Sequence, residues 1–240
     1  MREHLYHCRT VADQLSVCFT FDLQKTLVCP VILTGVAYHK RQLATYHNLG
    51  INNLAVNSAT MYKWHEGLAS CGTNDTGSCV IKYAESVVRN GAKSLTAFCH
   101  RNFTAALVVS FAVSNYQLVS HAVGSLFSAK RCWLRGHFEK YKKMRGDVCI
   151  PQHWIDVVKC ARNRRPLAVV EMTNDDSADV ISMSRQRMNR KHAGDGSQEV
   201  KWLDIQRIKF CGEDLNTMQV QYVDCNGSRL TSAVGHCIFA

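Results

Sequence analysis

The sequence has little proline and no apolar run long enough to cross a membrane. Its 240 residues include only 3 Pro, while 46% are hydrophobic and 20% are charged. This composition excludes collagen-like, low-complexity and disordered chains. The longest apolar stretch, 103–113, is about half the ~20 residues that a membrane-spanning helix needs. Residues 1–10 lack the apolar centre of a secretion signal, so we expect an intracellular globular protein without membrane contact.

The spacings of several common sites are also missing. The chain has 12 Cys and 11 His, but no C-x-x-C and no H-E-x-x-H, so structural or incidental roles are favoured over a zinc site. The phosphate-binding patterns G-x-G-x-x-G and G-x-x-x-x-G-K-[ST] are absent, which argues against nucleotide-binding enzymes of those classes. Cys99 and His100 are adjacent, whereas a working Cys-His pair normally meets through the fold. The sequence therefore predicts no cysteine nucleophile.

Acidic residues are outnumbered by basic ones. Lys and Arg total 29 against 19 Asp and Glu, a formal net charge of +10, which favours polyanionic partners. Most of the excess lies in 130–165, where aromatic side chains such as Trp133 and Tyr141 are interleaved with the basic ones. The predicted nucleic-acid-binding residues are Lys130, Arg131, Arg135, Lys140, Lys142, Lys143, Arg145, Arg162, Arg164 and Arg165. Two amphipathic helices with solvated charged faces explain this stretch equally well.

Hydrophobic patterns predict a mixed order of strands and helices. The expected order is β-β-β-α-β-α, with strands at 15–21, 36–46, 59–65 and 94–99 and helices at 77–90 and 103–116. The polar stretch 48–53 reads as a turn. Farther along, Pro151 opens a helix, 167–172 reads as a strand, and 175–197 reads as a loop or weak helix. Two late strands, 201–210 and 218–223, are expected to form a small hairpin or ribbon.

Asp22 directly follows the first expected strand. A two-metal nuclease needs two or three carboxylates that converge on Mg²⁺ or Mn²⁺, and these carboxylates are often found at strand ends. An aspartate that ends a strand is more often a turn residue, however. Asp22 alone is therefore a weak indication of a metal ligand.

Several segments, in the same order, carry a resemblance to a known family. They are 21–27, Gly35 with 41–43, 61–67, 77–79, 151–154 and 169–173. Together they resemble a family of uncharacterised, transposon-derived arthropod proteins that carry an RNase H-like core of the DDE integrase type. The resemblance spans roughly 21–210. It implies an α/β fold, in which an RNase H-like mixed β-sheet is flanked by helices and followed by a small C-terminal β extension.

The resemblance also implies which residues belong to the site. Asp22 matches the first acidic ligand of an ancestral Mg²⁺ or Mn²⁺ centre, and Glu139 matches the last acid of the trio. The second acid is expected just after the strand 94–99, where this chain instead continues with His100, Arg101 and Asn102. Without that carboxylate the second metal is unsupported. We therefore expect a catalytically inactive core.

Three regions are expected along the chain. They are an N-terminal remnant (1–14), the RNase H-like core (15–173), and a basic linker with a β ribbon (174–240). The predicted function is a transposase-derived protein that retains binding to nucleic acid, in particular DNA, with a nuclear location. Two alternatives stay open: a non-catalytic structural or protein-interaction domain, and a decayed element with no function.

Overall fold

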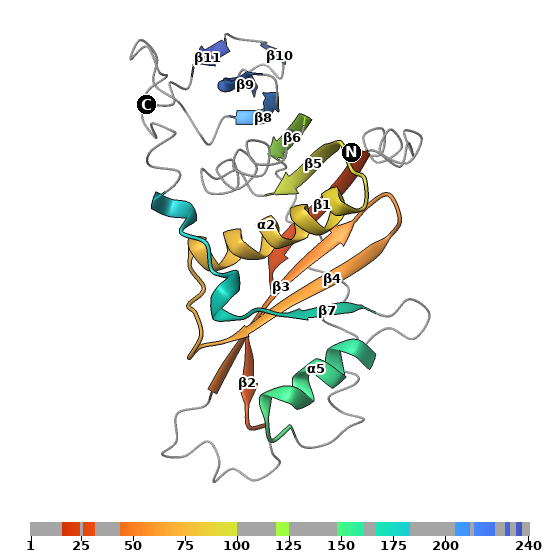
Figure 1. Ribbon diagram of the computed structural model, residues 1–240, viewed down its shortest axis with the longest axis vertical. Coiled ribbons are helices and arrows are strands. Elements are labelled where there is room, and N and C mark those ends of the chain that lie inside the picture. Colours follow the sequence, from red (N-terminus) through yellow and green to blue (C-terminus); the bar gives the residue numbers. More distant parts are fainter. Residues whose placement is uncertain are drawn as a thin grey trace.

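The sheet and its flanking helices appear in the computed structural model of the chain (Figure 1). The structure describes residues 16–24, 26–31, 44–99, 119–124, 148–160, 167–182, 205–211, 214–223, 229–230 and 234–236. Within these residues eleven strands belong to one sheet, and helices lie against it. The expectation of a mixed α/β sheet flanked by helices is confirmed.

The described elements follow each other along the chain in a mixed order. The strands are β1 (Ser16–Leu23), β2 (Leu27–Cys29), β3 (Ala44–Asn53), β4 (Ser58–His65), β5 (Ser94–Cys99), β6 (Val119–Gly124), β7 (Ala168–Glu171), β8 (Ile205–Cys211), β9 (Asp214–Val223), β10 (Arg229–Leu230) and β11 (Val234–His236). The helices are α2 (Thr73–Arg89), α5 (Pro151–Cys160) and the short 3-10 helix η2 (Asn174–Asp176). The expected helix at 103–116 lies outside the described residues.

The central part of the sheet has the strand order β6-β5-β1-β3-β4-β7. The strands β1, β3 and β4 form an antiparallel meander. On one side of it, β5 pairs parallel with β1, and β6 pairs parallel with β5. On the other side, β7 pairs parallel with β4. The first part of the chain therefore builds the middle of a mixed sheet.

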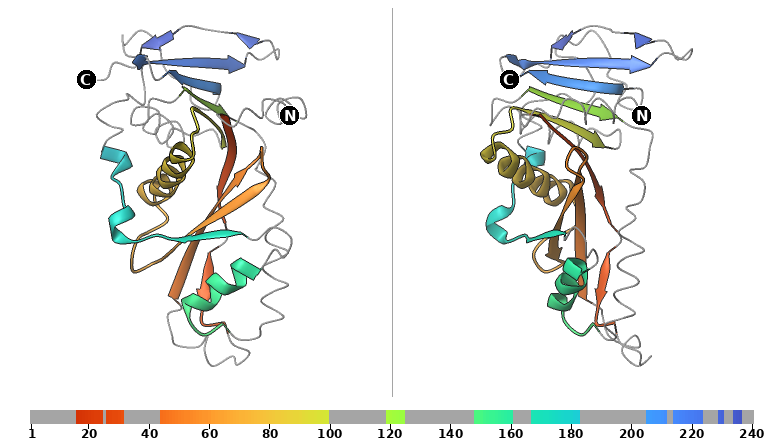
Figure 2. Two further views of the ribbon diagram at one scale, coloured as in Figure 1. Left: turned by 45° about the vertical axis from the view of Figure 1, so that its right-hand side comes forward. Right: turned by 90° about the vertical axis from the view of Figure 1, so that its right-hand side faces the viewer.

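The late strands extend this sheet. As expected, β8 and β9 pair antiparallel, and β8 also pairs antiparallel with β6. The turned views show the continuation from β5 through β6 to β8 and β9 (Figure 2). The β extension thus joins the edge of the main sheet through hydrogen bonds.

The expected turn at 48–53 is wrong, because this stretch is the second half of β3. Five of its residues pair with β1, from Leu49 opposite Leu23 to Asn53 opposite Phe19, and the same stretch pairs with β4 on its other side. Leu49 and Ile51 are buried. Pairing on both sides and burial of two side chains outweigh the turn preference of the asparagines.

Strand β4 is confirmed, but it is far more buried than its alternating pattern suggests. Met61, Tyr62, Lys63 and Trp64 are all buried. The reason is that β4 lies between β3 and β7 and carries packed clusters on both faces. The polar residue Lys63 in this strand is therefore inside the protein rather than on its surface.

Helix α2 begins earlier than its apolar pattern predicts. Asp75 Oδ2 accepts a hydrogen bond from the backbone N–H of Gly72 at 3.0 Å, so the polar segment before Gly77 forms the first turn and its cap. The expected end is confirmed, with Asn90 as the cap and Gly91 at φ +94°, a backbone conformation that favours glycine.

The main core lies between α2 and one face of the sheet. Its buried residues from α2 are Cys79, Val80, Ile81, Tyr83 and Ala84. They pack with buried residues of the strands, namely Phe19, Leu49, Ile51, Tyr62, Trp64, Leu95 and Ala97. The rings of Phe19 and Tyr83 lie 5.1 Å apart between centroids. This core fixes α2 across β1, β3 and β4 (Figure 1).

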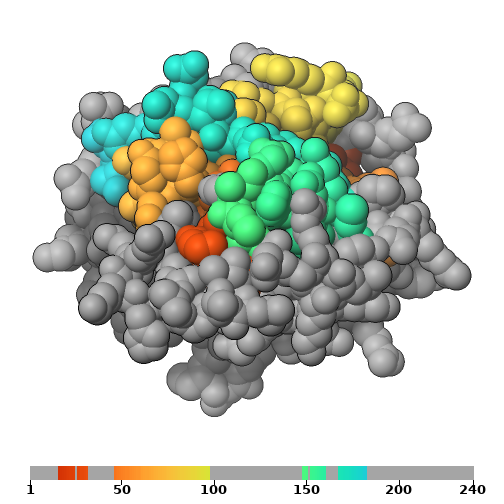
Figure 3. All heavy atoms as spheres, turned by 90° about the horizontal axis from the view of Figure 1, so that it is seen from below, coloured from red at the N-terminus to blue at the C-terminus, as the bar shows by residue number. Residues whose placement is uncertain are grey.

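Helix α5 begins at Pro151 as expected, and Trp154, Ile155 and Val158 are buried. Val158 packs with Ala59 and Met61 of β4, whose side chains point away from α2 because successive side chains in a strand alternate between faces. Figure 3 views the molecule from below and shows α5 beside the segment that contains β7. Helix α5 therefore covers part of the face that α2 leaves uncovered.

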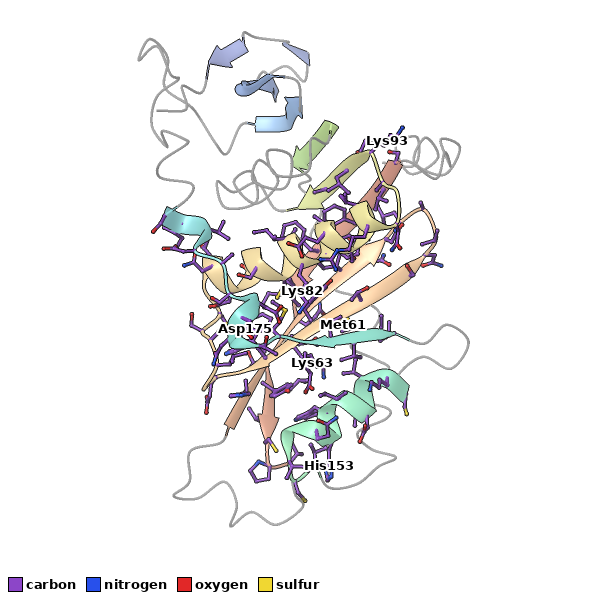
Figure 4. The ribbon with its side chains drawn as sticks, viewed as in Figure 1. Met61, Lys63, Lys82, Lys93, His153 and Asp175 are labelled. Atoms are coloured by element: carbon purple, nitrogen blue, oxygen red, sulfur yellow. The ribbon has the colours of Figure 1, made fainter. Side chains whose placement is uncertain are left out.

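The segment after β7 is anchored to α2. Lys82 forms an ion pair with Asp176 of η2 at 2.5 Å, and Ala178 N–H donates to Ser78 Oγ at 2.8 Å. Figure 4 shows Lys82 on α2 near η2. The expectation of a loop or weak helix in 175–197 is met as far as residue 182. In the described part of the chain no helix is long and apolar enough to cross a membrane.

Candidate functional site

Asp22 lies within β1, not after it, because the strand continues to Leu23. The backbone of Asp22 is paired with that of Gly50 in β3. Phe19 belongs to the core under α2, and Phe21 packs against that core. Because side chains alternate along a strand, the Asp22 carboxylate is on the opposite face, where it is half-buried.

The end of β5 lies beside Asp22. Strands β1 and β5 run parallel, and their last matched pair joins Thr20 with Phe98. Asp22 is two residues farther along β1, and β5 ends one residue after Phe98, at Cys99. Parallel strands present their carboxyl ends at the same edge of a sheet, which is where ligands commonly bind in open α/β sheets.

The other predicted site residues lie outside the described residues. They are Glu139 and the ten basic residues Lys130, Arg131, Arg135, Lys140, Lys142, Lys143, Arg145, Arg162, Arg164 and Arg165. Their roles stay predictions. Of the whole predicted set, the structure places only Asp22.

The metal-binding side chains that the structure describes are not clustered. In the described ranges, no three or more His, Cys, Asp and Glu side chains lie close enough together to hold a metal ion. The backbone oxygen of Asp22 accepts a hydrogen bond from Gln24 Nε2 at 3.3 Å, so the amide of Gln24 lies beside the backbone of Asp22. A clamp for two divalent cations requires several carboxylate oxygens.

Farther along the same face lies a buried lysine. Lys63 is fully buried, and its Nζ donates a hydrogen bond to the backbone oxygen of Trp154 in α5 at 3.1 Å. Figure 4 shows Lys63 on β4 near α5. Burial lowers the pKa of Lys63 to about 7, although Glu171 opposes this shift. The hydrogen bond from Lys63 therefore links α5 to the sheet, while removal of the amine from water reduces stability.

Tyr46 and Glu171 complete the surroundings of Lys63. The Lys63 Nζ lies 5.8 Å from the centre of the Tyr46 ring, and the Tyr46 hydroxyl donates to Glu171 Oε1 at 3.0 Å. Burial, together with Glu171, raises the pKa of Tyr46 to about 12. These contacts connect β3, β4, β7 and α5 in one polar cluster.

Asn48 is a buried amide without a described partner. It is directly opposite Lys63 in the β3–β4 register and is fully buried. Neither its Oδ1 nor its Nδ2 has a hydrogen-bond partner among the residues that the structure describes. An unsatisfied buried amide is destabilising by about 1–3 kcal/mol, so this face of the sheet carries polar groups at a cost in stability.

A Cys-His pair lies on the other face, and the sequence did not predict it. Cys71, in the turn before α2, places its Sγ 2.6 Å from His47 Nδ1 of β3. The two residues are 24 positions apart, so no short spacing pattern can reveal them. The cap sequence that follows Cys71 is the one signal that places this thiol at a helix start.

A small hollow lies near the start of α2. It has a volume of about 20 Å³ and is lined by residues that include Trp64, Leu68, Met172 and Thr173. This volume holds about one water molecule, whereas pockets for small-molecule ligands usually measure ~300–1,000 Å³. The hollow is therefore too small to be a substrate pocket.

Comparisons with known proteins do not place the chain in a family. No protein-family model matches the sequence, and no curated protein matches it. A solved structure described as the crystal structure of NurA is similar to it, with a TM-score of 0.24 and 9% sequence identity. The match covers 96% of this chain and 50% of the NurA chain, so this chain spans about half the length of that structure.

Proposed function

We propose that this chain is a transposase-derived protein with an RNase H-like core, which has lost catalysis and retains binding to nucleic acid. The observation that carries the proposal is the position of Asp22, on β1 and beside the end of the parallel strand β5. The first acid of an integrase-type core is expected at this place. The family resemblance of the sequence leads to the same residue.

The strand order supports an RNase H-like arrangement. Apart from the short strand β2, three antiparallel strands come first in the chain. Strands β5 and β6 then add in parallel on the free side of β1. Helix α2 lies between the meander and β5 in the sequence. The strands β7 and β8 extend this arrangement at its two edges. A fold alone does not fix a function, so the proposal also needs the site.

The loss of catalysis follows from the acids that are present. The residue after β5 is His100, not an aspartate, and the described residues contain no cluster of metal ligands. Metal-assisted phosphoryl transfer depends on cations that stabilise both the attacking and the leaving oxygen. A chain that lacks the middle carboxylate is expected to bind a second cation poorly and to leave DNA intact.

Binding to nucleic acid is motivated by charge. The formal net charge of +10 is concentrated in 130–165, and cationic side chains that neutralise phosphates release counterions from DNA. Such binding weakens steeply as salt rises. For roughly four phosphate contacts, the affinity for random DNA is expected to fall about 100-fold between 50 and 200 mM salt.

The test measures this salt dependence with a matched pair of variants. Replacing Lys142 and Lys143 together by Glu is expected to reduce the slope of log affinity against log salt by about 2. The control replaces Arg89 and Lys93, which are exposed in the structure and far from 130–165 in the sequence, by Glu. Figure 4 labels Lys93 at the turn after α2.

Two outcomes would contradict the proposal. A wild-type affinity that stays constant from 50 to 200 mM salt would remove the case for phosphate contacts and would favour a protein-interaction domain. An equal loss of affinity in both double variants would show that net charge matters and that 130–165 does not form the binding surface.

A further inference from the structure

The pair formed by Cys71 and His47 lies apart from the sheet face that carries Asp22. His47 shares its face of β3 with Leu49 and Ile51, which pack under α2. Cys71 directly precedes Gly72, the cap residue of α2. The fold thus brings a nucleophilic side chain and a basic one to 2.6 Å, measured from Sγ to Nδ1.

The two side chains differ in how far solvent reaches them. Cys71 is exposed, whereas His47 is only 8% exposed and its ring centroid lies 5.5 Å from that of Trp64. A dissolved reagent can therefore reach the sulfur, while the imidazole behind it is held in place and shielded from water. This is the arrangement that a base-assisted thiol requires.

Burial and nearby carboxylates set the resting protonation state of the pair. Burial lowers the pKa of His47 and raises that of Cys71, so both groups are neutral at rest at neutral pH. In the tautomer that carries its hydrogen on Nε2, His47 accepts the hydrogen bond of the thiol at Nδ1. Asp75 opposes the shift at His47, as does Glu66, because a carboxylate stabilises an imidazolium. Asp75 also raises the pKa of Cys71. When the proton moves from sulfur to nitrogen, Asp75 stabilises the imidazolium that forms and destabilises the thiolate that forms. The net charge of the pair stays zero, so these two effects of Asp75 oppose each other.

We propose that Cys71 is a reactive thiol with His47 as its base, and that this site reacts with low-molecular-weight disulfides. In the reaction, Cys71 Sγ attacks one sulfur of the disulfide while its proton moves to His47 Nδ1. A bond forms between Sγ and the attacked sulfur, and the bond between the two reagent sulfurs breaks. The leaving thiolate then takes the proton from Nδ1, so that one disulfide replaces another and one thiol replaces another. The start of α2 favours the developing negative charge on sulfur.

The chain contains its own controls. Cys149 and Cys160 are also exposed free cysteines. An ordinary thiol with a pKa of about 8.5 becomes roughly 25-fold more reactive between pH 6.5 and pH 8, because only the thiolate reacts. With a neutral His47 as base, the reactivity of Cys71 is expected to change less than about 3-fold over the same range.

The experiment measures alkylation of each cysteine by iodoacetamide from pH 6.5 to pH 8, with peptide mass spectrometry as the readout. The expected result is a flat profile for Cys71 and a steep one for Cys149 and Cys160. His47→Asn keeps a polar group at Nδ1 but removes the base, and it is expected to give Cys71 the steep profile. An equally steep profile for Cys71 in the unmodified protein would overturn the proposal, whether or not the variant folds.

The second readout uses oxidised glutathione as the disulfide. At pH 7, Cys71 is expected to form the mixed disulfide about 10-fold faster than Cys149 and Cys160, since about 3% of an ordinary thiol is ionised there. Modification of all three cysteines at equal rates would contradict the assignment. This result does not depend on DNA binding, so it stands or falls separately from the proposed function.

Discussion

The two faces of the sheet differ in what they bury. The face under α2 carries a continuous cluster of aromatic and aliphatic side chains from β1, β3, β4 and β5. The opposite face carries smaller apolar clusters together with Asp22, Asn48 and Lys63. Apolar burial stabilises the fold, whereas buried polar groups reduce stability unless they are fully paired. The first face therefore holds the fold together, and the second carries Asp22, the residue on which the proposed function rests.

Two neighbours in β3 represent this difference. Leu49 is 1% exposed in the core under α2, and Asn48 is 0% exposed on the opposite face. Both residues lie in the same strand and are equally buried. They differ in the face of the sheet on which the side chain lies and in whether that side chain is apolar or polar. Substitutions at these two positions should therefore change stability in opposite directions.

The largest effect is expected for Leu49→Ala. Removing a fully buried leucine side chain loses its transfer free energy and leaves a cavity, at a cost of about 2–5 kcal/mol. Urea unfolding measures this loss as a lower free energy of unfolding. Val56→Ala is the control, because Val56 is 63% exposed and should change stability by less than about 0.5 kcal/mol. A loss below 1 kcal/mol for Leu49→Ala would show that this face is not the main core.

The next effect concerns pH and tests the polar face. Burial lowers the folded-state pKa of Lys63 to about 7, while the amine in the unfolded chain keeps its ordinary value near 10.4. Between these values the unfolded state binds the extra proton, so stability rises with pH. From pH 7 to pH 9 the rise attributable to Lys63 is about 2–3 kcal/mol.

Lys63→Met removes this titration while filling a similar volume, so its stability is expected to lack the rise. Urea unfolding at pH 7, 8 and 9 compares it with the wild-type protein. Lys93→Met is the control, since Lys93 is exposed and its replacement should leave the pH dependence unchanged. The same rise in the Lys63→Met protein would mean that Lys63 stays charged in the folded state.

The smallest effect is expected for Asn48→Leu, and its sign is opposite to that of Leu49→Ala. An apolar side chain of similar volume removes two unsatisfied polar atoms, which should stabilise the protein by about 1–2 kcal/mol. Thermal or urea unfolding measures the gain. A loss of stability instead would mean that the amide has hydrogen-bond partners in solution.

The sequence predicts best those elements for which different local signals agree. The helix that ends at Asn90 and the strand 94–99 are confirmed because apolar spacing and a Gly91 stop agree. The turn expected at 48–53 was wrong because the three asparagines and the glycine of this stretch indicate a turn locally. The pairing of β3 with both β1 and β4 is a tertiary effect, and a single sequence window does not contain it.

The candidate sites are less predictable than the fold, for physical reasons. Asp22 was singled out because it follows the apolar stretch 15–21, and the structure adds that β1 continues past Asp22 and that the end of β5 lies beside it. The contact of Cys71 with His47 depends on how the turn before α2 sits on β3, which no spacing in the sequence encodes. The burial of Lys63 depends likewise on the docking of α5.

We propose that the protein binds DNA and that the core around Asp22 no longer cuts it. The most direct measurement incubates the purified protein with supercoiled plasmid DNA and Mn²⁺, and follows the appearance of nicked circles on a gel. We predict that the plasmid stays supercoiled at protein concentrations that saturate DNA binding. Nicking by the wild-type protein that disappears in Asp22→Ala would contradict the account, because it would show a working metal-dependent active site.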